Sequence, residues 1–394
     1  MPPAPVSRPM AFGARRKARV LLQASIAAVR AGIRFCITPL PRGQYFALST
    51  RPVILLVKDY AAPHPRAAFL GLLRRLRRHR PHVFYCTSWH VHPGLVEHHL
   101  NALRRLERAC PGVRITVMGQ TMTETDLFAA RGVQSLFCNQ NAFADERIFR
   151  PLPAIEKRFA AIYDAQLAPY KRHTLARKVF SLAMMGYRNP GTTNARYAAD
   201  TARKFATAHW FNDPTRSPDQ WRMTDEDVNL AYNQCGVGLC LSAVEGAMWA
   251  SIQYLLAGLP VVSTPSEGGR DEFFEAPHVR IVEPTQEAVT EGVAQLCSTG
   301  LDPEEVRGRT LARMEEHRQR FLSHVQALFE AAGEPRPFAE EWRQVIHHRL
   351  TDLTLVGRGK RRAIEEHNRR ILEAVEQGEP HPGSGEATGA QGAE

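Results

Sequence analysis

The sequence predicts an α/β protein built from two parallel sheets, each wrapped by helices. Short apolar runs alternate with amphipathic helical patterns twice along the chain. A segment without periodicity, near residues 139–155 and carrying two prolines, separates the two series. The length of 394 residues also suits two domains better than a single core.

In the first series, strands and helices follow one another in the order expected of a parallel sheet. The strands are VILLV (53–57), VFYCTS (83–88) and RITVMG (114–119). Helices are expected at 69–78 and 95–109, where apolar side chains recur at helical spacing.

The second series repeats the alternation and has clearer helix-end signals. Strands are expected at 159–166, 179–185, 237–243 and 260–264. Helices are expected after Lys171 and at 195–208, 225–234 and 247–257. Thr224 is well placed to cap the third of these helices and Gly258 to close the fourth. Charged helical patterns continue over 335–375, where Trp342 and Leu350 are expected in the core.

The composition is that of a soluble globular protein, with 44% apolar and 23% charged residues. A net charge of +11 favours nucleic acid, anionic lipid or phosphorylated substrates without choosing among them, but no basic stretch interleaved with aromatics supports nucleic-acid binding. Seven cysteines without a C-x-x-C pair indicate reduced thiols and a cytoplasmic location. The apolar run near the N-terminus is interrupted by Gln23 and Arg30, so it suits an amphipathic helix better than a signal peptide, and no run is long enough to span a membrane.

Two short motifs fall at the ends of neighbouring strands. Glu245-Gly246 follows one strand, Gly268-Gly269 follows the next, and a helix of about eleven residues joins the two strands in a βαβ unit. Both strands therefore end at the same sheet edge, where open α/β sheets bind ligands. Glycines let backbone N–H groups approach an anion, and a helix beginning near Arg270 would add a favourable dipole. We expect a phosphate-bearing ligand there, although a Gly-Gly pair alone also suits a simple turn.

The segment LSAVEGAMWASIQYLLAGLPVVSTPSEGGRDE resembles the donor-binding core of retaining GT-B glycosyltransferases of the family 4 type (glycosyl transferases group 1). The matching residues are Glu245, Gly246, Gly258, Pro260, Val261, Val262, Gly268, Gly269 and Glu272. The stretches NQNAFADERIFRP and AQLAPYKRH are similar to the family's linker and phosphate-binding turn. The resemblance is strong over about 139–275 and only architectural before that.

This resemblance implies a GT-B fold, in which two Rossmann-like domains face each other across a cleft. The expected parts are a flexible arm (1–17), an N-terminal acceptor-side domain (18–150), a C-terminal nucleotide-sugar-binding domain (151–330), helices packing back on the N-terminal domain (331–376) and a disordered tail (377–394).

The resemblance also implies a nucleotide-diphosphate sugar as donor. Glu245 would be the catalytic residue, contacting sugar hydroxyls near the reacting carbon, and Lys171 would contact the diphosphate. The expected donor-binding set is Lys171, Arg172, Gly246, Gln253, Gly268, Gly269, Arg270 and Glu272, with His90 as a further sugar contact. The sugar would pass to an unidentified glycan, lipid-linked or small-molecule acceptor with retention of configuration. No metal and no cofactor beyond the donor are expected, and a lipid-linked acceptor would suit a peripheral position at the inner face of the membrane.

Two positions depart from the family pattern. The second glutamate of the family, which holds the ribose, is Gln253 here, and the Gly-Arg before the lysine is Ala165-Gln166. The amide lacks charge assistance for its hydrogen bond to ribose, which costs about 1 kcal/mol. Arg172 or Arg270 could replace the missing cation. A catalytically weakened scaffold that only binds nucleotide sugar is therefore the alternative function.

The stretch TSWHVHPGLVEHH (87–99) contains four histidines and Glu97. A metal-dependent hydrolase is one interpretation, since H-x-H at a strand end can hold a metal. The resemblance offers another, because SWH is similar to a sugar-facing D-W-H stretch, with Ser88 in place of the aspartate. Ordinary loop histidines are the third. The helix at 69–78 has an apolar face opposite its arginines, which suits either a packed helix with a solvated side or contact with anionic lipid.

Overall fold

The computed structural model describes residues 45–58, 67–188, 194–212, 223–346, 350 and 360–381. The arm predicted at 1–17, residues 18–44 of the predicted N-terminal domain and most of the predicted tail lie outside the described residues. The first residues of that tail are placed, since the Thr50 N–H donates to the Pro380 carbonyl oxygen at 3.1 Å.

The first sheet has the strand order β1-β2-β3-β4-β5. β1 pairs with β2 in antiparallel fashion, and the remaining strands are parallel. The bounds are β1 Tyr45–Thr50, β2 Val53–Lys58, β3 His82–Cys86, β4 Arg114–Gly119 and β5 Ser135–Phe137. All residues of β1, β2 and β3 are buried, as expected of strands covered on both faces.

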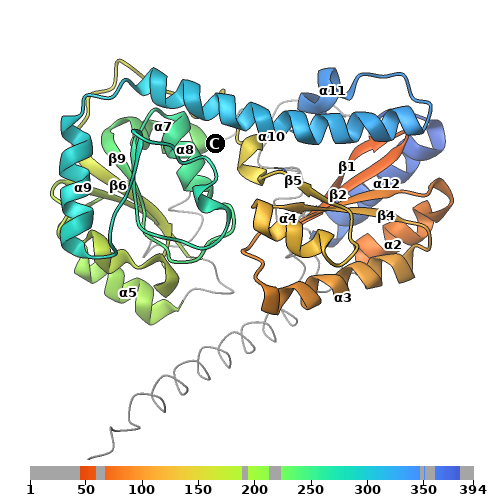
Figure 1. Ribbon diagram of the computed structural model, residues 1–394, viewed down its shortest axis with the longest axis horizontal. Helices are drawn as coiled ribbons and strands as arrows, with labels where there is room; N and C mark the ends of the chain where they lie inside the picture. The colour runs from red at the N-terminus through yellow and green to blue at the C-terminus, as the bar shows by residue number, and fades with distance from the viewer. Residues whose placement is uncertain are drawn as a thin grey trace, which may run out of the picture. The chain divides into compact units, whose positions relative to one another are not determined.

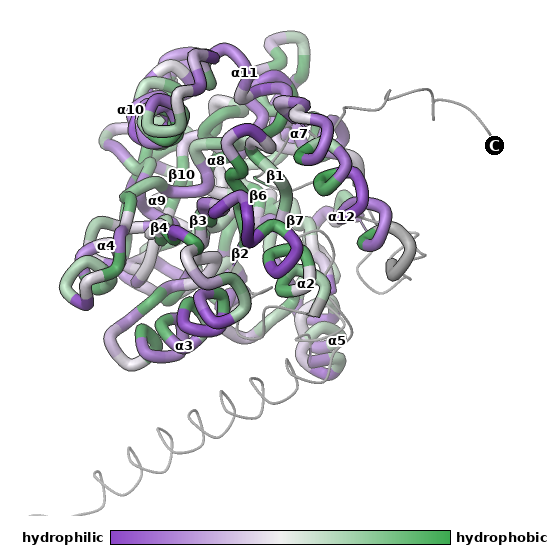
Figure 2. The backbone as a smooth tube through the Cα atoms, turned by 90° about the vertical axis from the view of Figure 1, so that its right-hand side faces the viewer, coloured by the Kyte–Doolittle hydropathy of each residue, from purple (hydrophilic) through white to green (hydrophobic). Residues whose placement is uncertain are grey.

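Helices cover both faces of this sheet (Figure 1). Their bounds are α2 Ala67–Leu76, α3 Pro93–Ala109, α4 Met122–Ala129, α10 Pro303–Ala331, α11 Phe338–Val345 and α12 Lys360–Gln377. One face packs in a single apolar cluster with α2, α3 and α12, and the other packs with α10 and α11. Along α3 and α12 the hydropathy alternates between purple and green in Figure 2, as amphipathic surface helices require.

The second sheet has six parallel strands in the order β11-β10-β9-β6-β7-β8. The bounds are β6 Phe159–Gln166, β7 Leu182–Tyr187, β8 His209–Trp210, β9 Cys235–Cys240, β10 Val261–Ser263 and β11 Val279–Ile281. Counted along the chain this is the order 6-5-4-1-2-3, the doubly wound Rossmann arrangement. Together the two α/β sheets confirm the predicted GT-B fold class.

Four helices surround the second sheet (Figure 1): α5 Ala195–Lys204, α7 Asp225–Asn233, α8 Trp249–Leu256 and α9 Gln286–Ser298. β9 shows how the faces divide, because its Val237 packs with Val293 of α9, whereas Cys240 belongs to the cluster that contains Ile252 of α8. Thr224 caps α7 as predicted, with a full capping box to Asp227.

The long helix α10 contacts elements of both sheets. Near its start, Arg307 donates to the Leu256 carbonyl oxygen of α8 at 3.0 Å. Two to three turns before its end, Phe321 packs on Phe84 of β3 with ring centroids 5.2 Å apart. The chain therefore returns to the first sheet within α10, and not after residue 330 as the predicted boundaries had it. Trp342 and Leu350 are buried, which confirms their predicted place in the core.

Two expected helices are absent from the described part of the second sheet. In place of the helix expected after Lys171, the chain forms the 3₁₀ turn His173–Ala176, which follows another 3₁₀ turn at Pro169–Lys171. At Arg270 there is only the three-residue 3₁₀ turn Gly269–Asp271, which is too short to provide the expected dipole. The strands β1, β5, β8 and β11 and the helices α4, α9 and α10 were not predicted from the sequence.

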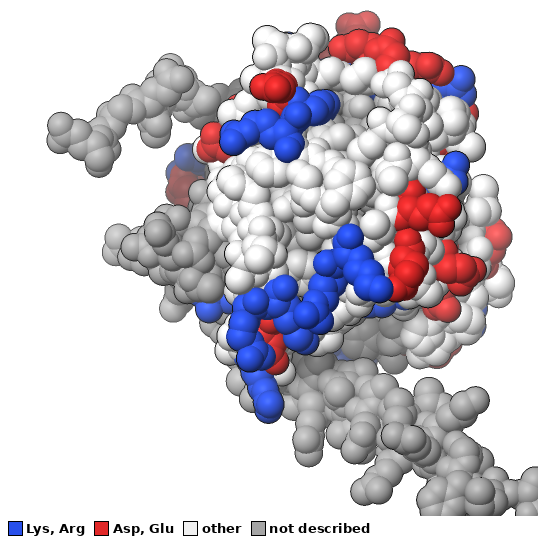
Figure 3. Space-filling model, turned by 90° about the vertical axis from the view of Figure 1, so that its left-hand side faces the viewer, with Lys and Arg blue, Asp and Glu red and all other residues white. Residues whose placement is uncertain are grey.

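The surface charge is unevenly distributed. On the side where α5 and α9 lie, Lys and Arg gather in groups that Asp and Glu side chains adjoin (Figure 3). In the described part of the chain, no helix combines the length and the apolar character needed to cross a membrane.

Replacing Gly258 tests the packing between α8 and α10. Gly258 has a φ of +77°, and an added Cβ would lie 2.5 Å from Pro303 Cβ. Gly258→Ala should lower the free energy of unfolding by about 2–4 kcal/mol through backbone strain and overpacking. Gly300→Ala is the control, since it shares a positive φ of +61° but meets no atom within 4 Å. Equal losses for both variants in urea denaturation would contradict the packing contribution.

Candidate active site

The candidate site lies where the strand order of the six-stranded sheet reverses. β6 and β9 are neighbours at that point, with later strands added on opposite sides. Ligands of open parallel sheets bind outside the carboxyl ends of the strands at such a reversal. Lys171 follows β6 and Glu245 follows β9, so the topology brings these two predicted residues to one place.

Lys171 is held inside the turn that follows β6. Arg172 adopts a left-handed conformation with a φ of 51°, which reverses the chain between the two 3₁₀ turns. The Lys171 carbonyl oxygen accepts a hydrogen bond from the hydroxyl of Tyr163, a fully buried residue of β6. The Lys171 side chain is consequently only 5% exposed.

Glu245 is the partner of Lys171. The Lys171 Nζ donates to Glu245 Oε1, and the Glu245 side chain is 6% exposed. Two charges removed from water depend strongly on each other, because loss of either leaves an uncompensated buried charge. The sequence placed both residues at the site but did not predict that they pair.

Arg270 has a different role from the expected contact with the diphosphate. Its guanidinium is completely buried and donates to the carbonyl oxygens of Cys240, Ser242 and Thr264 at 2.6–3.1 Å. Its Nε also donates to Asp271 Oδ1 at 2.6 Å. Arg270 therefore ties the ends of β9 and β10 together, with its donors directed at the protein.

Arg172 is also engaged by the protein. Its Nη2 donates to Thr264 Oγ1 at 2.6 Å, and its Nε donates to the Leu241 carbonyl oxygen at 2.5 Å. Burial lowers the pKa of the Arg172 guanidinium, although an arginine stays charged at neutral pH. Neither arginine offered as a substitute for the missing cation is thus directed freely at the site.

The glycines permit close contacts within the protein itself. A Cβ on Gly246 would lie 2.0 Å from the Ser88 carbonyl oxygen, and one on Gly268 would lie 1.8 Å from that of Glu245. A Cβ on Gly269 would lie 2.6 Å from Gln120 Cβ. Gly268 also has a φ of +98°. These contacts bring the loops after β3 and β4 against those after β9 and β10, so the glycines have a packing role beside any role in anion binding.

Gln253 lies on α8 with its side chain buried. The Tyr232 hydroxyl donates to Asp164 Oδ2 at 2.6 Å and lies 3.3 Å from Gln253 Oε1. The Gln253 Nε2 is buried without a hydrogen-bond partner. Gln166 lies at the end of β6 and accepts from the Tyr170 hydroxyl at 3.0 Å. An unpaired buried donor is costly, which makes Gln253 Nε2 a candidate for a ligand oxygen.

Glu272 points away from the Lys171–Glu245 pair and toward α10. Its carboxylate lies 3.3 Å from His317 Nε2 and 3.5 Å from Arg313 Nη2. The other ring nitrogen of His317 lies 3.3 Å from the backbone N–H of Asn139. The structure thus links Glu272 to the segment between the sheets and does not bring it to the other predicted donor residues.

The four histidines of 87–99 have separate partners. His92 caps α3 by accepting from the Gly94 N–H at 3.1 Å, and His99 lies 2.9 Å from the Tyr85 hydroxyl. The His98 ring contacts that of His99. His90 faces the loop that contains Gly268. The described residues contain no group of three or more side chains that could hold a metal ion, so the hydrolase interpretation gains no support from the histidines.

Glu124 is a residue of this region that the sequence analysis missed. It is completely buried, and its carboxylate accepts from the backbone N–H groups of Val91 and Gln120, both at 2.9 Å. His90 Nδ1 lies 3.3 Å from Glu124 Oε1. The pattern Thr-x-x-Glu at 121–124 is the sequence signal of a capping box, and it could have marked Glu124 as a helix-start residue.

His173 adds no charge to the site. It is buried next to Lys171, and its Nδ1 lies 3.0 Å from the Tyr197 hydroxyl. Burial, with a smaller contribution from Lys171, lowers the pKa of His173 to about 3. His173 is therefore neutral at physiological pH, and Lys171 supplies the cation next to Glu245.

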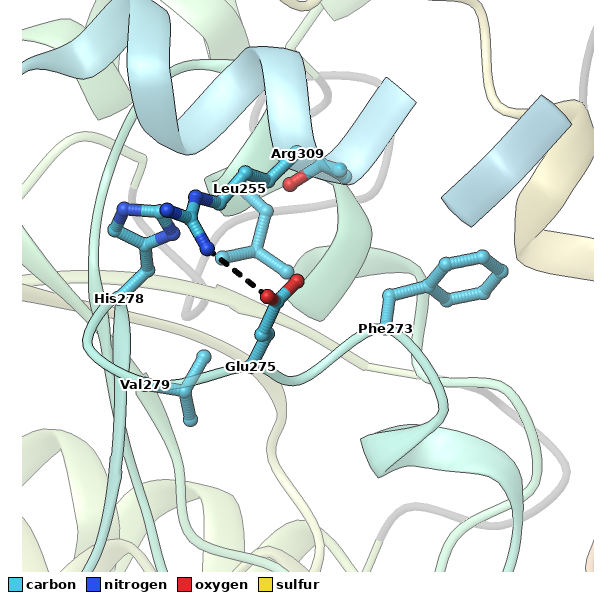
Figure 4. Close-up of a pocket in the computed structure, with 7 residues that line it drawn as sticks. Leu255, Phe273, Glu275, His278, Val279 and Arg309 are labelled. Atoms are coloured by element: carbon cyan, nitrogen blue, oxygen red, sulfur yellow. Dashed lines mark hydrogen bonds and ion pairs between the residues drawn. The ribbon is translucent and has the colours of Figure 1, made fainter. Parts of the chain in front are cut away.

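A cavity elsewhere in the second sheet is too small for a substrate. Leu255, Phe273, His278 and Arg309 are among the residues that line it (Figure 4). Its volume of about 10 Å³ matches a single water molecule. Arg309 is paired with Glu275 at its mouth, at 3.0 Å. The Lys171–Glu245 region remains the candidate site on chemical grounds.

Comparisons with known proteins return solved structures only. No protein-family model matches the chain, and no curated protein matches its sequence. The chain is similar to HepE of Anabaena in complex with UDP, with 12% identity over 66% of this chain and 76% of that one and a TM-score of 0.49.

Two further solved structures are similar at the same level. One is a UDP-forming α,α-trehalose-phosphate synthase from Burkholderia vietnamiensis, with 12% identity over 69% of this chain and 71% of that one and a TM-score of 0.47. The other is sucrose-phosphate synthase of Thermosynechococcus elongatus, with 13% identity over 68% and 73% and a TM-score of 0.42. The function therefore has to be inferred from the residues of the site.

The mutual dependence of Lys171 and Glu245 can be measured as a coupling energy. Lys171→Met and Glu245→Gln should each lower the free energy of unfolding by about 3–5 kcal/mol, because each leaves a buried charge unpaired. The double variant should be destabilised by less than the sum of the two. Additive losses in a double-mutant cycle by urea denaturation would show that the pair is not coupled.

Proposed function

We propose that this protein is a retaining, hexosyl-type glycosyltransferase that moves a sugar from a nucleotide diphosphate to an acceptor. The observation that carries the proposal is the buried pairing of Lys171 and Glu245 at the strand-order reversal. A buried lysine suits a diphosphate, and a buried carboxylate suits sugar hydroxyls. The resemblance of 139–275 to family 4 glycosyltransferases supports the same roles.

Donor binding in this proposal exchanges one anion for another. The diphosphate replaces the Glu245 carboxylate as the partner of Lys171, so the lysine keeps a counter-charge in a site with little water. Glu245 is then available to accept hydrogen bonds from the sugar hydroxyls near the reacting carbon. Charge-assisted bonds of this kind are about twice as strong as neutral ones.

The Gln253 amide gives the proposal a ribose contact. Its Nε2 is buried without a hydrogen-bond partner, and in this proposal it donates to a ribose oxygen. A neutral donor in place of a family carboxylate weakens the contact without removing it. A glutamine at position 253 is therefore compatible with binding of a nucleotide sugar.

Transfer itself rests on stabilising the departing diphosphate. Lys171 and nearby backbone N–H groups neutralise charge that grows on the leaving group, which is the largest contribution in many enzymes. Front-face attack, with the leaving phosphate taking the acceptor proton, gives retention without a separate general base. No metal is required in this scheme.

In this proposal the acceptor binds on the side of the first sheet, whose loops after β3 and β4 contact the site.

A peripheral position at the inner face of the membrane is also part of the proposal. Four exposed arginines support it by lining the end of α2 and the turn after it: Arg74, Arg75, Arg77 and Arg78. They could contact anionic lipid while presenting a lipid-linked acceptor.

Donor binding is tested by thermal stability against UDP-, GDP-, ADP- and dTDP-sugars. Saturating binding should stabilise the protein by about 2.7 kcal/mol at a hundredfold excess over Kd. Lys171→Ala should abolish the shift. The control is Lys178→Ala, which removes a lysine that is 58% exposed and pairs with Glu287 away from the site. A well-folded protein that responds to none of these donors would refute the proposal.

Turnover separates a transferase from a binding scaffold. An active enzyme should hydrolyse the bound donor slowly or transfer its sugar, and NMR of the first-formed product should show the anomeric configuration of the donor. Glu245→Ala should reduce kcat by at least about a hundredfold if the carboxylate acts in the transition state. Donor binding without turnover would instead identify a nucleotide-sugar-binding scaffold, the alternative suggested by Gln166 and Gln253.

The Gln253 contact predicts a specific loss of affinity. Gln253→Leu keeps the approximate volume but removes the amide, so affinity for the preferred donor should fall about fivefold. The 2′-deoxy form of the nucleotide should bind the variant and the wild type more nearly alike. A variant that binds ribose and deoxyribose donors with the wild-type ratio would place the ribose elsewhere.

A further inference from the structure

Glu124 lies at the centre of a set of hydrogen bonds beside the site. Its Oε1 accepts from the Val91 N–H, and its Oε2 accepts from the Gln120 N–H at 2.9 Å and from the Thr87 hydroxyl at 3.3 Å. The carboxylate thus joins the loop after β3 to the start of α4. Glu124 is 0% exposed, so its charge is fully withdrawn from water.

Such a charge requires a cation or an unusually complete set of donors. Among the ion pairs between described residues, Glu124 pairs with His90 alone, whose Nδ1 lies 3.3 Å away. The His90 side chain is 15% exposed, so the ring is held by Glu124 on one side and reaches toward solvent on the other. This geometry turns Nδ1 of His90 toward Glu124 in the protein interior and leaves Nε2 on the outer side of the ring.

The opposite nitrogen of His90 faces the loop after β10, which carries Glu267 and Gly268. His90 Nε2 lies 3.7 Å from Glu267 Oε2, and the Glu267 side chain is 74% exposed. A Cβ added to Gly268 would lie 3.0 Å from His90 Cβ and 1.8 Å from the Glu245 carbonyl oxygen. The charged groups facing the ring are therefore Glu124 from α4 and Glu267 from the loop after β10, with His92 on its own loop at 6.0 Å between centroids.

We propose that Glu124 is a positioning residue that holds His90 as an imidazolium, whose Nε2–H donates to a diphosphate oxygen of the nucleotide sugar. Donor binding displaces the exposed Glu267 carboxylate from this nitrogen. The inference rests on the proposed function and adds to it a pH-dependent cation supplied by the first sheet.

The charge balance of the site gives His90 this role. The family cation is replaced by Gln166, while Arg172 and Arg270 donate to protein carbonyl and hydroxyl oxygens. Of these two arginines and Lys171, the lysine is the one that pairs with Glu245. His90 contacts the same glycine loop, where a second positive charge would face the bound diphosphate.

The direction of the histidine pKa agrees with this role. The hydrogen bond to Glu124 raises the pKa of His90 above its ordinary value, against a smaller lowering by burial. A raised pKa means that the imidazolium persists to higher pH than in an exposed histidine. Donor affinity should consequently be full at low pH and decrease as pH rises through the pKa of His90.

The first experiment titrates His90 by NMR of its ring protons in the free protein, for the wild type and for Glu124→Gln. The pKa of His90 should be lower in Glu124→Gln, since the carboxylate charge is lost. Glu267→Gln is the matched control, because it removes the exposed carboxylate and should lower the pKa less. A His90 pKa that is unchanged in Glu124→Gln would overturn the proposal without any donor being present.

The second experiment measures the Kd of the best-binding nucleotide sugar, with UDP-glucose as the first probe, from pH 5.5 to 9. A sugar diphosphate diester is suitable because it lacks the terminal phosphate that titrates near pH 6. Wild-type affinity should fall about tenfold over this range, and the midpoint should move to lower pH in Glu124→Gln. A residue with only a structural role would weaken binding equally at every pH.

The outcomes distinguish a failure of the inference about His90 from a failure of the proposed function. Binding with the same pH midpoint in Glu124→Gln as in the wild type would overturn the inference alone. Binding by no nucleotide sugar at any pH would overturn the proposed function and the inference with it. If Glu124→Gln does not fold, His90→Gln replaces it, and its affinity should be independent of pH and equal to that of the wild type at high pH.

Discussion

The guanidinium of Arg270 holds the site together. It is buried between the ends of β9 and β10 and donates to three carbonyl oxygens at those ends. The two loops that carry Glu245 and Gly268 therefore keep a fixed separation. That separation allows the backbone contacts at Gly246 and Gly268, and through them the loops of the first sheet reach the second.

Around this framework the buried charges are arranged in pairs. Lys171 with Glu245 and His90 with Glu124 each combine a cation and a carboxylate that would be unstable alone. One member of each pair, Glu245 and His90, contacts the loop at Gly268. In the proposed function Lys171 exchanges Glu245 for the diphosphate, whereas His90 keeps Glu124 and releases the exposed Glu267.

The central strands of the second sheet could be predicted because they are mostly buried and apolar, and β6 has the expected bounds of 159–166. The edge strands β8 and β11 were not predicted, because they are short and partly exposed. The Glu245 and Lys171 positions followed from motifs at strand ends. Partners could not be predicted, since they depend on folding: Glu124 and His90 are 34 residues apart, and Glu272 turns to His317. The burial of Arg270 was missed for the same reason, because the carbonyl oxygens that surround it come from two separate loops.

The helix α10 has a consequence for how the chain is made. One face of the first sheet is covered by Phe321 and its neighbours, which are synthesised about 240 residues after Phe84. At ~5–20 residues per second, that face stays uncovered for roughly 10–50 s on the ribosome. The first sheet thus completes its core only when the end of the chain arrives, and its exposed strands during that interval are a natural substrate for chaperones.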